Sequence, residues 1–123
     1  MKMKKIVLTG AAGRLGSYLR EPLSKMADQL LSTDISNDIG SLYDNETFVK
    51  ADLAEMSEIK PLMKDADMVV HFGAYVDEGP FEKLWGPNFV GSYNVWESAR
   101  LAGVKRVIYA SSIHAVGLSL IHI

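Results

Sequence analysis

The sequence predicts an α/β fold in which helices cover both faces of an open, parallel sheet. Short apolar runs alternate with segments of helical periodicity through most of the 123 residues, and 48% of the residues are hydrophobic. Strands that alternate with helices favour right-handed crossovers and hence a parallel sheet. We therefore expect one doubly wound α/β domain with about five strands.

The first half of the chain predicts three strands and one helix. Residues 6–8 are an apolar run closed by a threonine and a glycine, as in a strand buried on both faces. Residues 14–26 repeat apolar residues at helical spacing, which predicts an amphipathic helix that Pro22 should bend. Residues 29–33 and 47–50 predict two further strands. The apolar face of the helix should comprise Leu15, Leu19, Leu23 and Met26.

The second half predicts two helices and two strands. Residues 55–64 indicate a short helix, and residues 68–72 a buried strand. Residues 81–102 predict a long helix that Gly103 would end as a C-cap, before a last strand at residues 106–111. The side of the long helix that faces the sheet should consist of Asn88, Ser92, Val95, Ala99 and Ala102.

Composition narrows the classes of partner. The 13 basic and 15 acidic residues give a net charge of -2, which offers no electrostatic reason to expect nucleic acid or an anionic membrane. There is no cysteine, and no histidines and carboxylates are spaced like a metal-ligand set. The apolar run after the basic start is too short for a signal peptide. We expect a small-molecule ligand, no metal and a cytoplasmic location.

A glycine-rich turn lies between the first expected strand and the first helix. By sterics, Gly10 allows the tight turn, Gly13 lets backbone approach a pyrophosphate, and Gly16 lets the helix pack closely on the strand. Arg14 and Leu15 stand at the helix start, where unpaired N–H groups and a partial positive charge attract an anion. The alternative is a turn with a purely structural use, since a tight strand-to-helix connection needs glycine in any case.

An acidic residue, Asp34, ends the second expected strand. It follows Gly10 at roughly the 20-residue spacing at which a carboxylate binds the ribose hydroxyls of NAD. A carboxylate there repels the 2′-phosphate of NADP, and no arginine follows at once to bind one, so the expected cofactor is NAD. The alternative is that Asp34 starts a turn as an Asx residue, because residues 36–45 are rich in Ser, Asn, Asp and Gly and predict a loop.

Further motifs follow in order along the chain. They are Thr9-Gly-x-x-Gly-x-x-Gly16, Asp34, Asp52-Leu53, His71-Phe72-Gly73-Ala74, Asn88-x-x-Gly91-x-x-Asn94 and Tyr109-Ala110-Ser111-Ser112. Over residues 4–117 this pattern resembles the extended short-chain dehydrogenases, the NAD-dependent epimerase/dehydratase family, with its Rossmann-type sheet. Within that family Gly73, Glu78 and the segments GSYNVWESAR and ASSIHAVG are most similar to the uronate dehydrogenases.

The resemblance implies roles for five residues around the cofactor. Asp52 would hydrogen-bond the adenine amino group, and Leu53 would supply a backbone contact and apolar cover. Gly73 and Ala74 would line the adenosine ribose and the diphosphate with backbone. Asn88 would project toward the active-site end of the sheet. The alternatives are structural, with Asp52 capping the following helix and Asn88 starting one.

The resemblance also implies a substrate site. Ser112 would be the catalytic serine that orients the substrate hydroxyl, and His114 would contact the substrate. Ser112 could instead satisfy strand-end backbone groups and His114 could be a loop residue. Where uronate dehydrogenases carry polar substrate contacts, this chain has Ile113 and Val76, so a sugar acid or a less polar sugar-like alcohol is expected. His71, within an apolar strand, is expected to be a packed core histidine.

Hydride transfer in this family needs a tyrosine general acid/base with a lysine four residues later. The five tyrosines are followed at that spacing by Pro22, Thr47, Gly79, Glu97 and Ile113. None of these residues is lysine, and in the family the pair follows the serine motif. We therefore expect a truncated, N-terminal, cofactor-binding part of an NAD-dependent oxidoreductase, inactive by itself.

Residues 118–123 depart from the family pattern. Their sequence, LSLIHI, is what a transposon-end adapter used in sequencing libraries encodes in frame, so we expect an NAD-binding domain in residues 1–117 and a non-native tail. The alternative for the tail is a natural apolar strand. A sugar-nucleotide epimerase or dehydratase and a non-catalytic NAD-sensing protein of the same fold stay open as functions. Relatives often dimerise through helices that include residues 81–102, so a homo-oligomer is expected for the longer protein.

Overall fold

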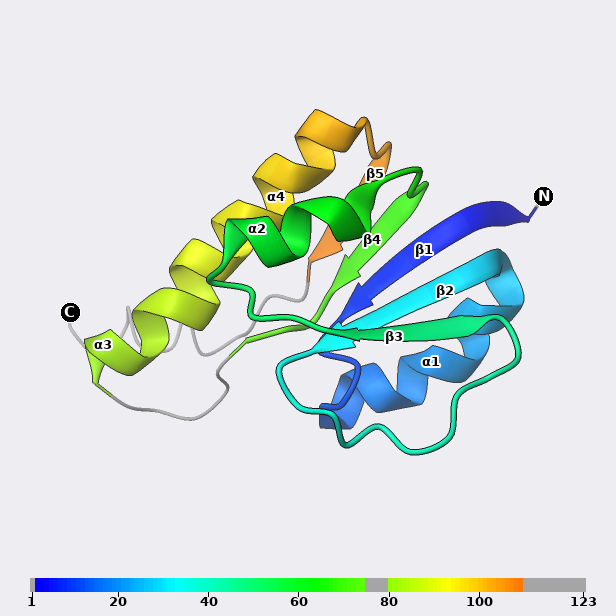
Figure 1. Cartoon of the computed structure of the whole chain (residues 1–123), viewed down its shortest axis with the longest axis horizontal. Helices are drawn as coiled ribbons and strands as arrows, with labels where there is room; N and C mark the ends of the chain where they lie inside the picture. The colour runs from blue at the N-terminus through cyan, green and yellow to red at the C-terminus, as the bar shows by residue number, and fades with distance from the viewer. Residues whose placement is uncertain (1, 75–79, 110–123) are drawn as a thin grey trace, which may run out of the picture.

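One parallel sheet of five strands organises residues 2–74 and 80–109, the part of the chain that the computed structural model describes (Figure 1). The strands are β1 (Met3–Thr9), β2 (Ala27–Asp34), β3 (Glu46–Lys50), β4 (Met68–His71) and β5 (Arg106–Tyr109). Their order in the sheet is β3-β2-β1-β4-β5, and every neighbouring pair is parallel. The predicted doubly wound, Rossmann-type sheet is confirmed.

The register aligns the carboxyl ends of the three central strands. Thr9 of β1 pairs with Thr33 of β2 on one side and with His71 of β4 on the other. The chain leaves β1 toward β2 and later returns to the other side of β1 as β4, so the direction of strand order reverses here. In open α/β sheets, ligands bind in the crevice outside the carboxyl ends of the strands at such a reversal.

Helices lie on both faces of the sheet, with α1 on one side and α2 and α4 on the other (Figure 1). The helical segments are α1 (Arg14–Met26), α2 (Met56–Ile59), the 3-10 helix η1 (Lys60–Met63), α3 (Phe81–Leu84), the π-helix η2 (Trp85–Val90) and α4 (Gly91–Ala102). Among the described residues, none of these segments has both the length and the apolar character that a membrane span requires.

Two hydrophobic cores fill the space between the sheet and the helices. Successive side chains of a strand point to opposite faces. Val7 therefore joins the core that contains Val95 of α4, whereas Ile6 and Leu8 join the core that contains Leu23 of α1. All five of these side chains are buried, with relative exposures between 0% and 7%.

The buried face of α1 differs from the expected one. Leu15 and Met26 are 62% and 45% exposed, whereas Arg20 is buried. The reason lies at Gly16, which packs directly against the backbone of the preceding turn. This contact turns the side of the helix that carries Gly16 and Arg20 inward, and leaves Leu15 outside.

The predicted long helix at residues 81–102 is helical throughout but not uniformly α-helical. A π-helical stretch, η2, separates α3 from α4. Pro87 within it has no backbone N–H to donate, so the α-helical ladder of hydrogen bonds cannot continue through it. The expected sheet-facing side is wrong at its end, because Ala102 is exposed. Gly103 ends α4 at φ 75° as the predicted C-cap.

Several sequence-based expectations fall on residues that the structure does not describe. The end of the last expected strand, at residues 110–111, is among them, as is the predicted tail at residues 118–123. Of the predicted NAD-binding domain, residues 1–117, the structure describes residues 2–74 and 80–109.

Candidate cofactor site

The glycine-rich turn lies at the carboxyl end of β1, where the strand order reverses. Gly10 has φ 72°, and a methyl group there would lie 2.6 Å from the carbonyl carbon of Phe72. A methyl group on Gly16 would lie 1.9 Å from the carbonyl oxygen of Gly10. Both positions therefore require glycine, one for the conformation and close approach of the turn, the other for the packing of α1 against it. Gly13, by contrast, is exposed, and its N–H donates to the Gly10 carbonyl at 3.0 Å.

The N-terminus of α1 opens directly after this turn. Its N-cap is Gly13, which offers no side-chain cap, and the first turn holds no acidic residue. The first N–H groups of a helix have no partner within the helix, so those of Arg14 and Leu15 point outward with the positive end of the helix dipole. Such an end suits a phosphate group.

Asp34 bridges the end of β2 and the glycine turn. Its Oδ2 accepts the N–H of Ala12 at 3.0 Å, and its Oδ1 accepts the N–H of Ser36 at 3.0 Å. The second bond is the Asx turn that we gave as the alternative role. The two roles are compatible, because each carboxylate oxygen has a further lone pair with which to accept a ligand hydroxyl.

Leu53 connects the segment after β3 with two glycines. Its Cδ1 would lie 2.5 Å from a methyl group on Gly73, and its Cβ would lie 2.9 Å from one on Gly91. The Leu53 carbonyl accepts the side-chain amide of Asn94 at 2.8 Å. The sequence pattern includes Gly91 and Asn94 but assigned them no role, because only the fold brings α4 against residue 53.

Asp52 forms a tight turn of its own rather than capping α2. Its Oδ1 accepts the N–H of Ala54 at 2.9 Å, while the N-cap of α2 is Glu55. The helix-capping alternative is therefore wrong. Asn88 lies within η2. In the same segment, a methyl group added to Gly86 would lie 3.6 Å from the Cβ of Ala54.

Thr9 is a site residue that sequence reasoning missed. Its hydroxyl oxygen accepts the N–H of Phe72 at 3.0 Å and of Gly73 at 2.9 Å, and lies 2.6 Å from Nδ1 of His71. The two N–H groups already use both lone pairs of the hydroxyl oxygen, so Thr9 cannot accept a third bond and instead donates its one proton to Nδ1. The signal in the sequence was a hydroxyl residue at the end of a buried strand, directly before the glycine turn.

His71 is a packed core histidine, as predicted, and is 2% exposed. Because Nδ1 accepts from Thr9, we assign the neutral ring with its proton on Nε2, which lies 3.5 Å from the Ser92 hydroxyl. Burial lowers the pKa of His71 to about 4. This neutral histidine ties β1 and β4 together beside the glycine turn.

We expect the stability of the fold to depend on His71 at mildly acidic pH. Since the pKa of a histidine in the unfolded chain is near its ordinary value of 6.5, the unfolded chain binds the proton first. Stability is then complete above about pH 6.5 and falls by up to about 3 kcal/mol as the pH approaches 4. Urea unfolding at a series of pH values measures this loss. An NMR titration that gives His71 a pKa near 6.5 would contradict the assignment.

The structure describes only one of the remaining predicted site residues. Ala74 is exposed and follows Gly73, three residues after the end of β4. Ser112 and His114, the predicted catalytic and substrate residues, lie outside the described residues, as do Val76 and Ile113. The structure thus describes the cofactor half of the candidate site.

Comparisons with known proteins agree on one family. The sequence model for the "NAD dependent epimerase/dehydratase family" matches residues 6–120. The chain is 42% identical over 113 residues to uronate dehydrogenase of Pseudomonas putida, in an alignment that covers 92% of this chain and 42% of that protein. It is 39% identical to uronate dehydrogenase of Agrobacterium fabrum, covering 94% and 43%. The chain thus spans about two-fifths of the length of these relatives.

Solved structures give the same result. Uronate dehydrogenase from Agrobacterium tumefaciens matches with a TM-score of 0.84 and 39% identity, covering 91% of this chain and 42% of that one. A mutant of that enzyme complexed with NAD matches with a TM-score of 0.83 and 39% identity, covering 89% and 41%. A UDP-galactose 4-epimerase matches with a TM-score of 0.77 and 28% identity, covering 89% and 38%.

Proposed function

This chain belongs to the NAD-dependent epimerase/dehydratase family, and we propose that it forms the NAD-binding part of a dehydrogenase that oxidises a hydroxyl group of a sugar acid or a similar sugar. The observation that carries the proposal is the 39–42% sequence identity to uronate dehydrogenases over nearly the whole chain. The glycine turn, the free N-terminus of α1 and the carboxylate of Asp34 support it, because they meet at one edge of the sheet.

The described residues suit each part of the cofactor. The N-terminus of α1 would hold the pyrophosphate, because its N-cap, Gly13, has no side chain that would block the approach of a phosphate to the helix N–H groups. Asp34 would accept hydrogen bonds from the hydroxyls of the adenosine ribose, and Asp52 with Leu53 would border the adenine. When bound, NAD supplies the acceptor for the hydride that leaves the substrate carbon.

The proton of the substrate hydroxyl needs a separate acceptor. We propose that Ser112 orients that hydroxyl and that a tyrosine of a Tyr-x-x-x-Lys pair, in the longer protein, takes the proton. Ile113 and Val76 stand where relatives place polar contacts, which supports a substrate somewhat less polar than a uronate. The cytoplasmic location and the homo-oligomeric state of the longer protein stay predictions.

Replacing Asp34 by asparagine should raise the dissociation constant for NAD at least about tenfold, since hydrogen bonds to a charged group contribute about 1.5–3 kcal/mol. Asparagine has one acceptor oxygen, so it can keep the turn-forming bond from the Ser36 N–H, whereas the bond from the Ala12 N–H is lost. Isothermal titration of the chain measures the change. Asp38→Asn, in the same loop, is the matched control and should leave the constant unchanged. Equal affinities for both variants would contradict the assigned role of Asp34.

The proposed activity is tested on the longer protein. Sequencing the source DNA beyond the codon for Gly117 should reveal a Tyr-x-x-x-Lys pair, and the full enzyme should form NADH when supplied with uronic acids or related sugars. Activity only toward sugar nucleotides would instead favour an epimerase or dehydratase. NAD binding without any such pair would favour an NAD-sensing protein.

A further inference from the structure

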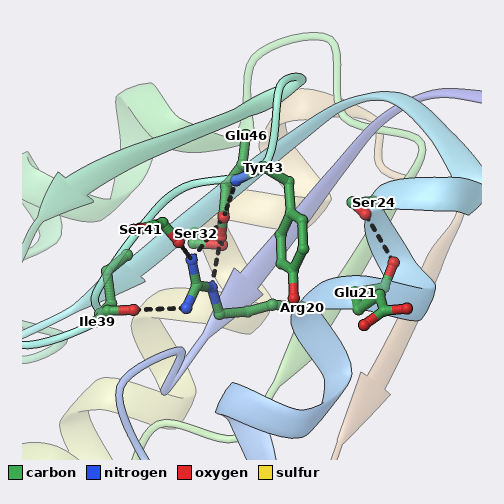
Figure 2. Close-up of polar contacts among 8 residues, drawn as sticks. All are labelled: Arg20, Glu21, Ser24, Ser32, Ile39, Ser41, Tyr43 and Glu46. Carbon is green, nitrogen blue, oxygen red and sulfur yellow. Dashed lines mark hydrogen bonds and ion pairs between the residues drawn. The ribbon is translucent and has the colours of Figure 1, made fainter.

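A buried ion pair joins α1 to the first residue of β3. Figure 2 shows Arg20 reaching from α1 to Glu46, with Nε at 2.8 Å from Oε2 and Nη2 at 2.7 Å from Oε1. The side chains are only 8% and 0% exposed. Ser32 of β2 also donates to the Glu46 carboxylate. This bidentate pair therefore has a fixed geometry.

The same arginine holds the loop between β2 and β3. Its Nη1 donates to the Ile39 carbonyl at 2.6 Å, and its Nη2 donates to the Ser41 carbonyl at 2.8 Å (Figure 2). The N–H of Tyr43 donates to Glu46 Oε1 at 3.2 Å, and the Tyr43 ring centre lies 5.5 Å from the guanidinium carbon. Arg20 and Glu46 thus bind residues 35–45 through three of their backbone groups.

This loop is also attached at both of its ends. It begins at Asp34, whose carboxylate accepts the Ser36 N–H. It ends at Asn45, whose side-chain amide donates to the carbonyls of Ser24 at 2.7 Å and of Ala27 at 3.0 Å. Between these ends, the hydrogen bonds to Arg20 and Glu46 attach the middle of the loop to α1 and to β3. Ser36 is only three residues from Ile39, so a loop released by Arg20 would restrain the Ser36 N–H less and leave the Ala12 N–H as the other backbone donor to the Asp34 carboxylate.

The loop has no cationic side chain to bind a 2′-phosphate. Residues 35–45 include two aspartates and no lysine or arginine. Arg20, which lies beneath the loop, already uses four of its N–H bonds on Glu46 and the loop carbonyls. Its charge is balanced by Glu46, so it does not attract a phosphate to this side of the sheet.

We propose that the Arg20–Glu46 pair positions the 35–45 loop so that the Asp34 carboxylate stays fixed beside the glycine turn, and that it thereby helps the site to select NAD over NADP. The inference rests on the proposed function and concerns residues that do not touch the cofactor. A carboxylate held in place accepts ribose hydroxyls without an ordering cost, and cannot swing away from a 2′-phosphate.

The test compares NAD and NADP affinities of the chain and its variants by isothermal titration. Arg20→Met/Glu46→Gln removes both charges and the bonds to the loop, and leaves an oxygen for Ser32. We expect the dissociation constant for NAD to rise about fivefold and that for NADP to change less than about twofold. Arg20→Lys keeps the positive charge but loses the two parallel hydrogen bonds of the guanidinium to Glu46. Its dissociation constant for NAD should lie between those of the wild type and the double variant.

Two controls separate positioning from a general loss of stability. Lys25→Met/Glu21→Met removes an exposed pair, 3.1 Å apart, on the same helix and should not alter the ratio of affinities. Limited proteolysis should cut residues 35–45 faster in the Arg20 variants than in the wild type. If the double variant does not fold, Arg20→Lys decides the question.

The outcomes distinguish the two proposals. A wild-type chain that is folded but binds no NAD contradicts the proposed function. A wild type that prefers NAD, with the same preference within about twofold in both Arg20 variants, contradicts only the positioning role. A loop that is no more cleavable in the variants also contradicts it.

Discussion

Gly16→Ala is expected to destabilise the fold by about 3 kcal/mol or more and to abolish NAD binding. The added methyl group would lie 1.9 Å from the carbonyl oxygen of Gly10, and that contact is with backbone rather than with a flexible side chain. Either α1 moves away from β1 or the turn deforms. Both changes displace the helix N-terminus that would hold the pyrophosphate. Urea unfolding and NAD titration of the variant measure the two effects.

Gly86→Ala provides the matched control for this change. Its added methyl group would meet the Ala54 side chain at 3.6 Å, an ordinary contact, within a helical segment of the same chain. We expect its stability to stay within about 0.5 kcal/mol of the wild type. Gly16→Ala with unchanged stability and NAD affinity would show that α1 does not pack on the turn as described.

Arg20→Met is expected to cost about 3–5 kcal/mol, because it leaves the buried carboxylate of Glu46 without its partner. The double variant Arg20→Met/Glu46→Gln should be the more stable of the two, since it removes both charges. Urea unfolding of Arg20→Met, Glu46→Gln and the double variant completes the double-mutant cycle. Lys25→Met, which breaks an exposed pair, should cost less than about 1 kcal/mol. A loss of similar size in Arg20→Met and Lys25→Met would contradict the buried pair.

The same pair makes the stability sensitive to strong acid. Burial alone would raise the pKa of Glu46, but hydrogen bonds from Arg20 and Ser32 outweigh it and hold the pKa below the ordinary value of 4.5. The folded chain therefore keeps this carboxylate ionised to lower pH than the unfolded chain does. Its contribution is present above about pH 4.5 and is lost as the pH falls through the folded value, so the loss begins at the acid end of the range in which His71 acts.

Local patterns predicted the sheet well because they act over short distances. The apolar runs that became β1 and β4 are buried on both faces, so their composition alone identifies them as strands. The glycine turn was predictable for a similar reason. Gly10 needs a positive φ and Gly16 a close backbone contact, and both requirements are visible in the spacing.

Features that depend on distant parts of the chain were not predictable from patterns. Arg20 is buried because Glu46, far along the sequence, meets it across the fold, whereas a charged residue within a helix suggests solvent exposure. Thr9 acquires its role only when β4 lies beside β1. The π-helical η2 interrupts the predicted helix around Pro87, and the chain continues as α4 beyond it.

Isothermal titration of the folded chain with NAD and with NADP tests the central claim most directly, with circular dichroism to establish the fold. The account predicts saturable binding of one NAD per chain, weaker binding of NADP, and no binding by Gly16→Ala. A folded chain that gives no saturable heat with NAD, or that binds NADP more tightly, would contradict the account.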